Sequence, residues 1–158
     1  MKIALLLTGK TTDRYVAEGV TLYSERIRKY SGFEIITIPD MKNTRNMPVV
    51  EQKNREGRKI LESVRKDDFV VLLDERGKEL RTVEFADWLR KQSSVMSGKR
   101  LLFLTGGPWG VSEEVYKAAD LKLSLSKMTF PHQLVRLIFL EQIYRAFTII
   151  RGEPYHHE

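Results

Sequence analysis

Two loops in the C-terminal half of the chain contain the residues best suited to bind a ligand. The first, Gly106–Gly110, reads GGPWG and follows an apolar run; the second, Ser126–Phe130, follows another apolar run. Glycine has no Cβ, so it lets a ligand approach backbone amides closely. Loops that follow neighbouring strands form the ligand crevice of an open α/β sheet. We therefore predict a pocket here; for the glycine loop alone, a tight strand-to-helix turn is the alternative.

Several other kinds of chemical site are excluded by spacing. Gly9-Lys10-Thr11 resembles the end of a phosphate-binding loop, but Ala4 stands where that motif needs another glycine. The glycine loop also lacks the GxGxxG spacing of dinucleotide-binding proteins. There is no cysteine, and the three histidines do not form a metal-binding set: His132, His156 and His157. No serine–histidine–acid arrangement stands out, so the residues alone predict a pocket without metal and do not identify a reaction.

Alternating apolar runs and helical stripes indicate how these loops are positioned. The predicted strands are Lys2–Leu7, Phe33–Ile38, Phe69–Leu73, Arg100–Thr105 and Leu121–Leu125. The predicted helices span residues 16–30, about 49–65, 82–98, a short segment before residue 121, and Pro131 to about Ile150. Strands that are apolar throughout and alternate with helices predict an α/β fold with a mostly parallel sheet covered on both faces. A chain of 158 residues without a linker fits a single domain, residues 1–158.

The net charge of +6 is concentrated in the first two-fifths of the chain. Residues 1–66 contain 14 Lys/Arg and 8 Asp/Glu, which gives +6, whereas residues 67–158 contain 13 of each. The basic residues include four on one predicted helix: Lys53, Arg55, Arg58 and Lys59. An anionic partner, most commonly nucleic acid, is one explanation, and a solvated helix surface is the other. No segment is long enough for a signal-peptide core or a membrane span, so we expect a cytoplasmic protein.

The last predicted helix is apolar around nearly its whole circumference. Its apolar residues run from Leu134 to Phe147 and face every direction. Such a helix has to be covered on more than one side. We expect a second copy of the chain to supply part of that cover, giving a homodimer; packing within one chain is the alternative.

Four motifs together resemble one bacterial protein family. They are Gly106-Gly107-Pro108-x-Gly110, the run from Leu123 to Arg136 (LSLSKMTFPHQLVR), Glu141-Gln142-x-Tyr144-Arg145-Ala146, and the ending Pro154-Tyr155-His156-His157. The chain resembles, over essentially its whole length, the RlmH-type ribosomal RNA large-subunit methyltransferases of the SPOUT superfamily. This resemblance implies a deep C-terminal trefoil knot, a homodimer and S-adenosylmethionine bound in the knot. The implied reaction methylates N3 of a pseudouridine in a hairpin loop of 23S rRNA within the assembled ribosome.

The resemblance also implies which residues form the site. The cofactor would contact Leu73, Gly106, Leu125, Ser126, Lys127, Met128, Thr129 and Phe130. A tail folded over the cofactor would bring His156 or His157, beside Tyr155, close enough to act as general base for the N3 proton. Arg136, Glu141 and Arg145 would hold the target base or the dimer, although Glu141 and Arg145 also have the spacing of an ordinary helical ion pair.

For several of these residues, an ordinary structural role is the alternative to a functional one. Leu73, Leu125, Met128 and Phe130 could simply pack in the core. Trp109 and Tyr155 could stack on RNA bases, and core packing is the alternative for Trp109. The basic helix and the loop with Lys42 and Arg45 would then bind phosphates.

The sequence is also compatible with two other functions. One is a non-catalytic ribosome-binding or assembly factor that retains the knotted fold; the other is a nucleotide-binding protein of another family, which would need the phosphate loop that is missing. Intact cofactor loops favour the enzyme. Residues 74–77 and Trp109 depart from the pattern of the family that the chain resembles.

Overall fold

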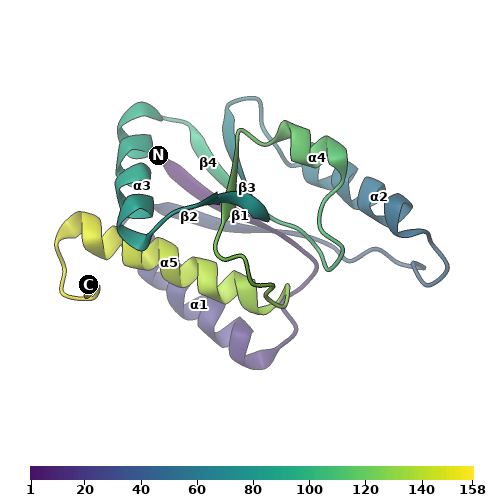
Figure 1. Cartoon of the computed structure of the whole chain (residues 1–158), viewed down its shortest axis with the longest axis horizontal. Helices are drawn as coiled ribbons and strands as arrows, with labels where there is room; N and C mark the ends of the chain where they lie inside the picture. Colours follow the sequence, from purple (N-terminus) through teal and green to yellow (C-terminus); the bar gives the residue numbers. More distant parts are fainter.

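The computed structural model describes residues 1–158 and contains one five-stranded parallel sheet (Figure 1). The strands are β1 (Lys2–Thr8), β2 (Gly32–Ile38), β3 (Asp68–Glu79), β4 (Arg100–Thr105) and β5 (Leu121–Ser124), and their order across the sheet is β2-β1-β4-β3-β5. The helices are α1 (Arg14–Arg28), α2 (Val49–Glu62), α3 (Thr82–Val95), α4 (Glu113–Ala118) and α5 (Leu134–Arg151). The α/β class and the parallel pairing predicted from the apolar runs are confirmed. No helix is both long and apolar enough to span a membrane.

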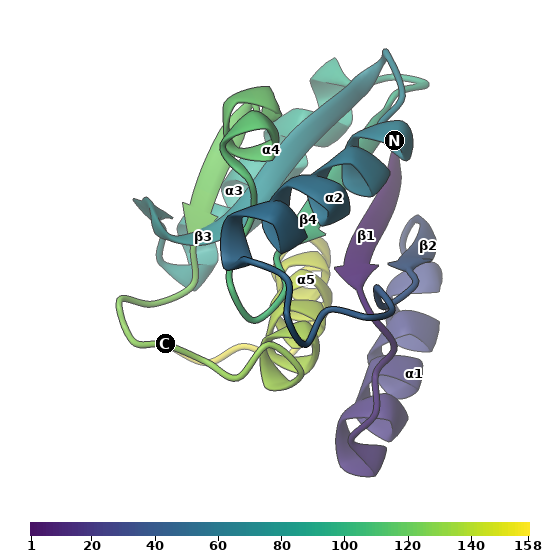
Figure 2. The same cartoon turned by 90° about the vertical axis from the view of Figure 1, so that its right-hand side faces the viewer.

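The side chains of the central strands alternate between two hydrophobic cores. Ile3, Leu5 and Leu7 of β1 face the larger core, which α1, α3 and α5 cover. Ala4 and Leu6 face the smaller core, which α2 and α4 cover. Viewed from the side that carries α2, the structure shows this helix in front of the sheet and α5 behind it (Figure 2). Both faces of the sheet are therefore buried at its centre, which explains why β1 and β4 are almost entirely apolar.

Helix α5 lies against the sheet with α1 on one side and α3 on the other. Phe139 meets Phe103 of β4 edge-on at 4.7 Å between ring centroids, and Phe147 stacks on Tyr30 at 5.4 Å. Packing within the chain thus accounts for much of the apolar circumference that the sequence had suggested would need a second copy. The predicted start of the helix at Pro131 is wrong by three residues. Residues 131–133 form a turn that is held to the β1–α1 loop by the Gln133 side chain.

Strand β3 is longer than predicted. Its expected end at Asp74–Gly77 is wrong, because β3 continues to Glu79 with a break in its register against β5 between Leu73 and Lys78. Within this bulge the Arg76 guanidinium donates to the Asp74 carboxylate at 3.0 Å. Gly77 lies so close to β5 that an added Cβ would be 2.6 Å from the backbone carbon of Lys122. A bulge lets polar residues remain in a strand while their side chains leave the ladder, so polarity alone did not mark a strand end.

Candidate functional site

A cavity of about 760 Å³ opens at the carboxyl ends of β3, β4 and β5. Its walls come from three segments: the β3 bulge, the glycine loop after β4 and the loop between β5 and α5. Seven of the eight residues predicted to contact a cofactor line this cavity: Leu73, Gly106, Leu125, Ser126, Met128, Thr129 and Phe130. The eighth, Lys127, is exposed and does not line it. Residues separated by more than fifty positions in the sequence are thereby brought into one pocket.

The glycine loop forms a closed turn at the rim of this cavity. The Gly110 N–H donates to the Gly107 carbonyl at 3.0 Å, and Gly110 adopts a left-handed backbone with φ of 81°. At Gly106 and Gly107, the direction in which a Cβ would point leads to other parts of the protein. A Cβ at Gly107 would lie 3.1 Å from the Glu56 carboxylate, and one at Gly106 would lie 3.1 Å from the Gly110 backbone. The glycines therefore allow the loop to pack tightly against its own surroundings, which in turn shapes the pocket wall.

Helix α2 supports both ends of the glycine loop. The half-buried carboxylate of Glu56 contacts the Gly107 amide; burial raises its pKa, the amide opposes that rise, and the negative charge of Asp40 adds to it. At the next position, Gly57 lies against Ser112, where an added Cβ would be 2.3 Å from the Ser112 hydroxyl. That hydroxyl caps α4 by accepting the Val115 N–H. The basic helix is thus packed directly against the loop that lines the cavity.

The loop between β5 and α5 is held by local hydrogen bonds. The Ser126 hydroxyl accepts the Met128 N–H at 2.9 Å, and the Ser124 hydroxyl donates to the Ser126 carbonyl at 3.0 Å. Met128 is 77% exposed and Trp109, on the glycine turn, is 60% exposed. Core packing, the alternative considered for both residues, is wrong. Leu73, Leu125 and Phe130 are partly buried, and all three also face the cavity.

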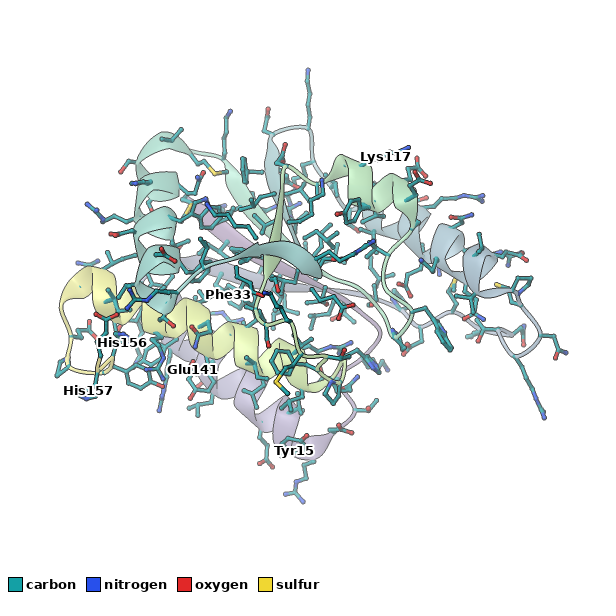
Figure 3. The ribbon with its side chains drawn as sticks, viewed as in Figure 1. Tyr15, Phe33, Lys117, Glu141, His156 and His157 are labelled. Carbon is teal, nitrogen blue, oxygen red and sulfur yellow. The ribbon has the colours of Figure 1, made fainter.

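Three of the residues predicted to be catalytic, Arg145, Tyr155 and His156, form a separate cluster with Glu141. Figure 3 labels Glu141 and the two tail histidines. The Glu141 carboxylate accepts the Arg145 Nε–H at 2.9 Å and the Tyr155 hydroxyl at 3.0 Å. The Arg145 guanidinium lies over the Tyr155 ring, 4.7 Å from its centroid, and its Nη1 is 3.4 Å from His156 Nδ1. Burial, with hydrogen bonds to Tyr23 and Glu141, raises the pKa of Tyr155, while the hydrogen bond to Glu141 raises that of Arg145. The helical ion pair expected from the spacing of Glu141 and Arg145 is confirmed.

This cluster does not line the cavity of its own chain. Val135, at the cavity, and Arg145 are about 15 Å apart along the α5 axis, given the rise of a helix. The tail ends beyond α5, where Tyr30, in the turn after α1, donates to Glu153 at 2.6 Å. His156 is partly buried, its Nε2 lacks a hydrogen-bond partner, and His157 is exposed. The structure therefore does not bring His156 or His157 to the pocket of the same chain, whereas His132 lines it.

Arg136 has a role that the sequence did not reveal. Its side chain is 1% exposed and donates to the Thr8 carbonyl at 2.7 Å, the Gly9 carbonyl at 3.0 Å and the Thr11 hydroxyl at 2.9 Å. Burial lowers the pKa of this guanidinium. Since its donors are directed at the β1–α1 loop, Arg136 joins that loop to the start of α5 and is not available to a base or a second subunit. A lone arginine in the apolar run LVRLIFL was the signal that could have suggested burial.

Positive charge lies next to the cavity on α2. Lys53 lines the cavity, Arg58 is exposed, and Arg55 is paired with Glu51 at 2.7 Å. The structure contains no group of His, Cys, Asp and Glu residues that could hold a metal ion. The cavity itself combines apolar walls with hydroxyls, backbone polar groups and the charged side chains of Lys53, Asp74, Glu75 and Arg76, which suits a small molecule with both polar and apolar parts.

Comparison with known proteins places this geometry in context. A family model described as "Predicted SPOUT methyltransferase" matches residues 1–156. The chain is 51% identical over 158 residues to the "Ribosomal RNA large subunit methyltransferase H" of Parabacteroides distasonis, with all of both chains covered. It is also 51% identical over 157 residues to the protein of that name from Christiangramia forsetii, with 99% of each chain covered.

A solved structure has the same fold at low sequence identity. It is the tRNA (m1G37) methyltransferase from Aquifex aeolicus, and the two structures superpose with a TM-score of 0.51 at 17% sequence identity. The match covers all of this chain and 76% of the Aquifex aeolicus chain. At that identity the likeness concerns the fold alone.

Proposed function

The chain belongs to the family of SPOUT methyltransferases, and we propose that it is the enzyme that methylates N3 of a pseudouridine in a hairpin loop of 23S rRNA within the assembled ribosome. The observation that carries this proposal is full-length identity of 51% to ribosomal RNA large-subunit methyltransferases, together with a formed cavity between the loops that the family's motifs occupy. These relatives are named for ribosomal RNA of the large subunit, and the pseudouridine, its N3 atom and the ribosomal context are what we add to that.

The cofactor is S-adenosylmethionine, and the cavity is suited to it. Leu73, Leu125 and Phe130 would provide apolar walls for the adenine, and Gly106 and Ser126 would present backbone and hydroxyl groups to its polar edges and to the ribose. When bound, the cofactor supplies an electrophilic methyl group on a sulfonium, which leaves as a neutral thioether when the methyl joins N3 in place of the N3 proton. The protein's task is then to align N3 with the methyl and to accept that proton.

A homodimer would bring the tail cluster to this reaction. His156 and His157 lie at the end of α5 away from the cavity, so they would act at the cavity of the partner if two copies packed along α1 and α5. Exposed apolar side chains on α1, Tyr15 at 61% and Leu22 at 44%, support this face as the interface. In that arrangement Arg145 and Tyr155, fixed by Glu141, hold the target base, and one of the two histidines accepts the N3 proton.

The domain and its C-terminal knot are also part of what we propose. Residues 1–158 form a single SPOUT domain whose segment from Leu125 to α5 completes a trefoil knot. Two observations support the knot: this segment lies beside the β3 bulge and the glycine loop at one cavity, and Arg136 and Gln133 then join it to the β1–α1 loop. Because its substrate is the ribosome, the enzyme acts in the cytoplasm.

The alternative is a ribosome-binding or assembly factor that retains the fold without activity. The formed cavity and its hydrogen-bonded loops favour the enzyme, since an inactive factor would not need to keep them. Incubation with ribosomes from a strain that lacks the modification, followed by nucleoside mass spectrometry of the 23S rRNA, separates the two. We expect N3-methylpseudouridine to appear only with S-adenosylmethionine. Ribosome binding without a new methyl group would support the inactive factor instead.

The double substitution of His156 and His157 by alanine tests the proposed base. We expect methyl transfer to slow more at neutral pH than at high pH, where the N3 proton is lost to solvent more readily. An equal loss at every pH would instead indicate a positioning role.

A further inference from the structure

Two large apolar side chains are exposed at the mouth of the cavity. Trp109 comes from the glycine turn after β4 and Met128 from the loop before α5, and both line the cavity while remaining 60% and 77% exposed. No other large hydrophobic side chain of the cavity is exposed. Exposed apolar surface gathered at one pocket marks a place where another molecule binds.

The backbone that carries each of these side chains is held by a short, closed turn. Trp109 is the third residue of the turn closed by the Gly110 N–H and the Gly107 carbonyl, and Pro108 before it has a fixed φ. The Met128 backbone is fixed by its hydrogen bond to the Ser126 hydroxyl. Surfaces that are already fixed lose little conformational entropy when a ligand binds. The backbone at the mouth is therefore preorganised for binding.

The charges around the mouth identify the class of occupant. Lys53 of α2 lines the cavity and Lys127 precedes Met128 in the loop, and neither lysine takes part in an ion pair. One carboxylate outside an ion pair, that of Glu75, also lines the cavity and accepts the Thr129 hydroxyl at 3.4 Å. Arg76 is also present, but its guanidinium is bound to Asp74 and lies over the Tyr116 ring. An aromatic face with unpaired lysines beside it is the arrangement that binds single-stranded nucleic acid, with a base on the ring and phosphates on the lysines.

We propose that Trp109 and Met128 form a subsite for the base of a nucleotide next to the methylated one in the RNA, with Lys53 and Lys127 binding the adjoining phosphates. This inference rests on the proposed function. The reacting base has to enter the cavity to meet the cofactor, whereas Trp109 is exposed at its mouth and so meets a neighbour of that base. Because every base has a π-face, the subsite holds an unpaired neighbour without reading its identity.

Substitutions of Trp109 test the subsite in the methylation assay on ribosomes. We expect Trp109→Ala to lower kcat/KM about ten- to a hundredfold, mainly through KM, because stacking of one base contributes to binding by that amount. Trp109→Phe keeps an aromatic face and should stay within about threefold of wild type, whereas Trp109→Leu should resemble the alanine variant. Affinity for S-adenosylhomocysteine and thermal unfolding should not change. Val95→Ala, which shortens an apolar side chain outside the cavity that is even more exposed than Trp109, is the control.

The failures of the two proposals can be told apart. If wild type methylates ribosomes and Trp109→Ala or Trp109→Leu matches it, the subsite is refuted and the function stands. A parallel loss of S-adenosylhomocysteine affinity would also refute it, since Trp109 would then act on the cofactor.

If wild type does not methylate ribosomes, the proposed function fails, and a separate measurement decides the subsite. We expect a short oligouridylate to quench tryptophan fluorescence in wild type and not in Trp109→Phe, which leaves Trp88 as the only tryptophan. Absence of quenching in wild type would overturn the inference.

Discussion

Replacing Arg136 by methionine should destabilise the protein strongly, because this side chain joins α5 to the β1–α1 loop. The change removes three hydrogen bonds from a charged donor and leaves the Thr8 and Gly9 carbonyls unpaired in the interior. Hydrogen bonds that involve a charged group contribute about 1.5–3 kcal/mol each. Removal of the buried charge, whose desolvation lowers the pKa of Arg136, offsets part of this loss. We expect a net loss of about 2–4 kcal/mol in the free energy of unfolding.

Urea denaturation of wild type and variants at neutral pH measures this effect. The midpoint should fall while the dependence on urea stays the same, and the melting temperature should drop by roughly 5–15 °C. The stability of Arg136→Lys should lie between those of wild type and Arg136→Met, since one ammonium group cannot reach three acceptors as a guanidinium does. Arg14→Met, on the exposed side of α1, is the control and should change stability by less than about 0.5 kcal/mol. A change in Arg136→Met as small as in this control would refute the structural role assigned to Arg136.

Two further predictions concern α2. Burial and Asp40 raise the pKa of Glu56, so the charged form is disfavoured in the folded protein and wild type loses stability relative to Glu56→Gln as pH rises through that raised pKa. Thermal unfolding should show the variant at least as stable at pH 7 and the difference vanishing below about pH 4, near the ordinary pKa of glutamate; a gap that widens toward acid pH would contradict this. Neutralising Lys53, Arg55 and Arg58 together should weaken ribosome binding and reduce the slope of log K against log salt by about two, because Arg55 is already paired with Glu51. An unchanged slope would place the RNA-binding surface elsewhere.

Much of the fold could be predicted because its signals are local. Apolar runs marked all five strands, and the loops after β4 and β5 stood out by their glycine, proline and serine content. The parallel sheet then brought these loops to one edge without any further information. The bulge in β3 was missed because four polar residues normally end a strand, and only the neighbouring β5 keeps this one paired as far as Glu79.

Buried charge was the main feature that the sequence concealed. Arg100 begins β4 and Asp68 begins β3, where the two are register partners, and the guanidinium donates to this carboxylate at 2.6 and 2.8 Å with both side chains almost fully buried. Each residue alone looks like an exposed strand end. Only the pairing of two distant strands shows that each charge is the partner of the other.

The tail was predicted to fold over the cofactor, and within one chain it does not, for a related reason. The motif that ends in His156 and His157 indicates membership of a family, but not whose pocket it serves. Because α5 separates the tail from the cavity of its own chain, the catalytic role that we propose for the tail requires a second copy, which one sequence does not describe.

Calorimetric titration of S-adenosylhomocysteine into the purified protein tests the central claim most directly. We expect saturable binding of one ligand per cavity in wild type. The same titration of Gly106→Val should show no binding while thermal unfolding shows a folded protein, because a side chain there would press on the Gly110 backbone and distort the pocket wall. Equal affinity in the two proteins, or no binding to wild type, would contradict the assignment of this cavity to the cofactor.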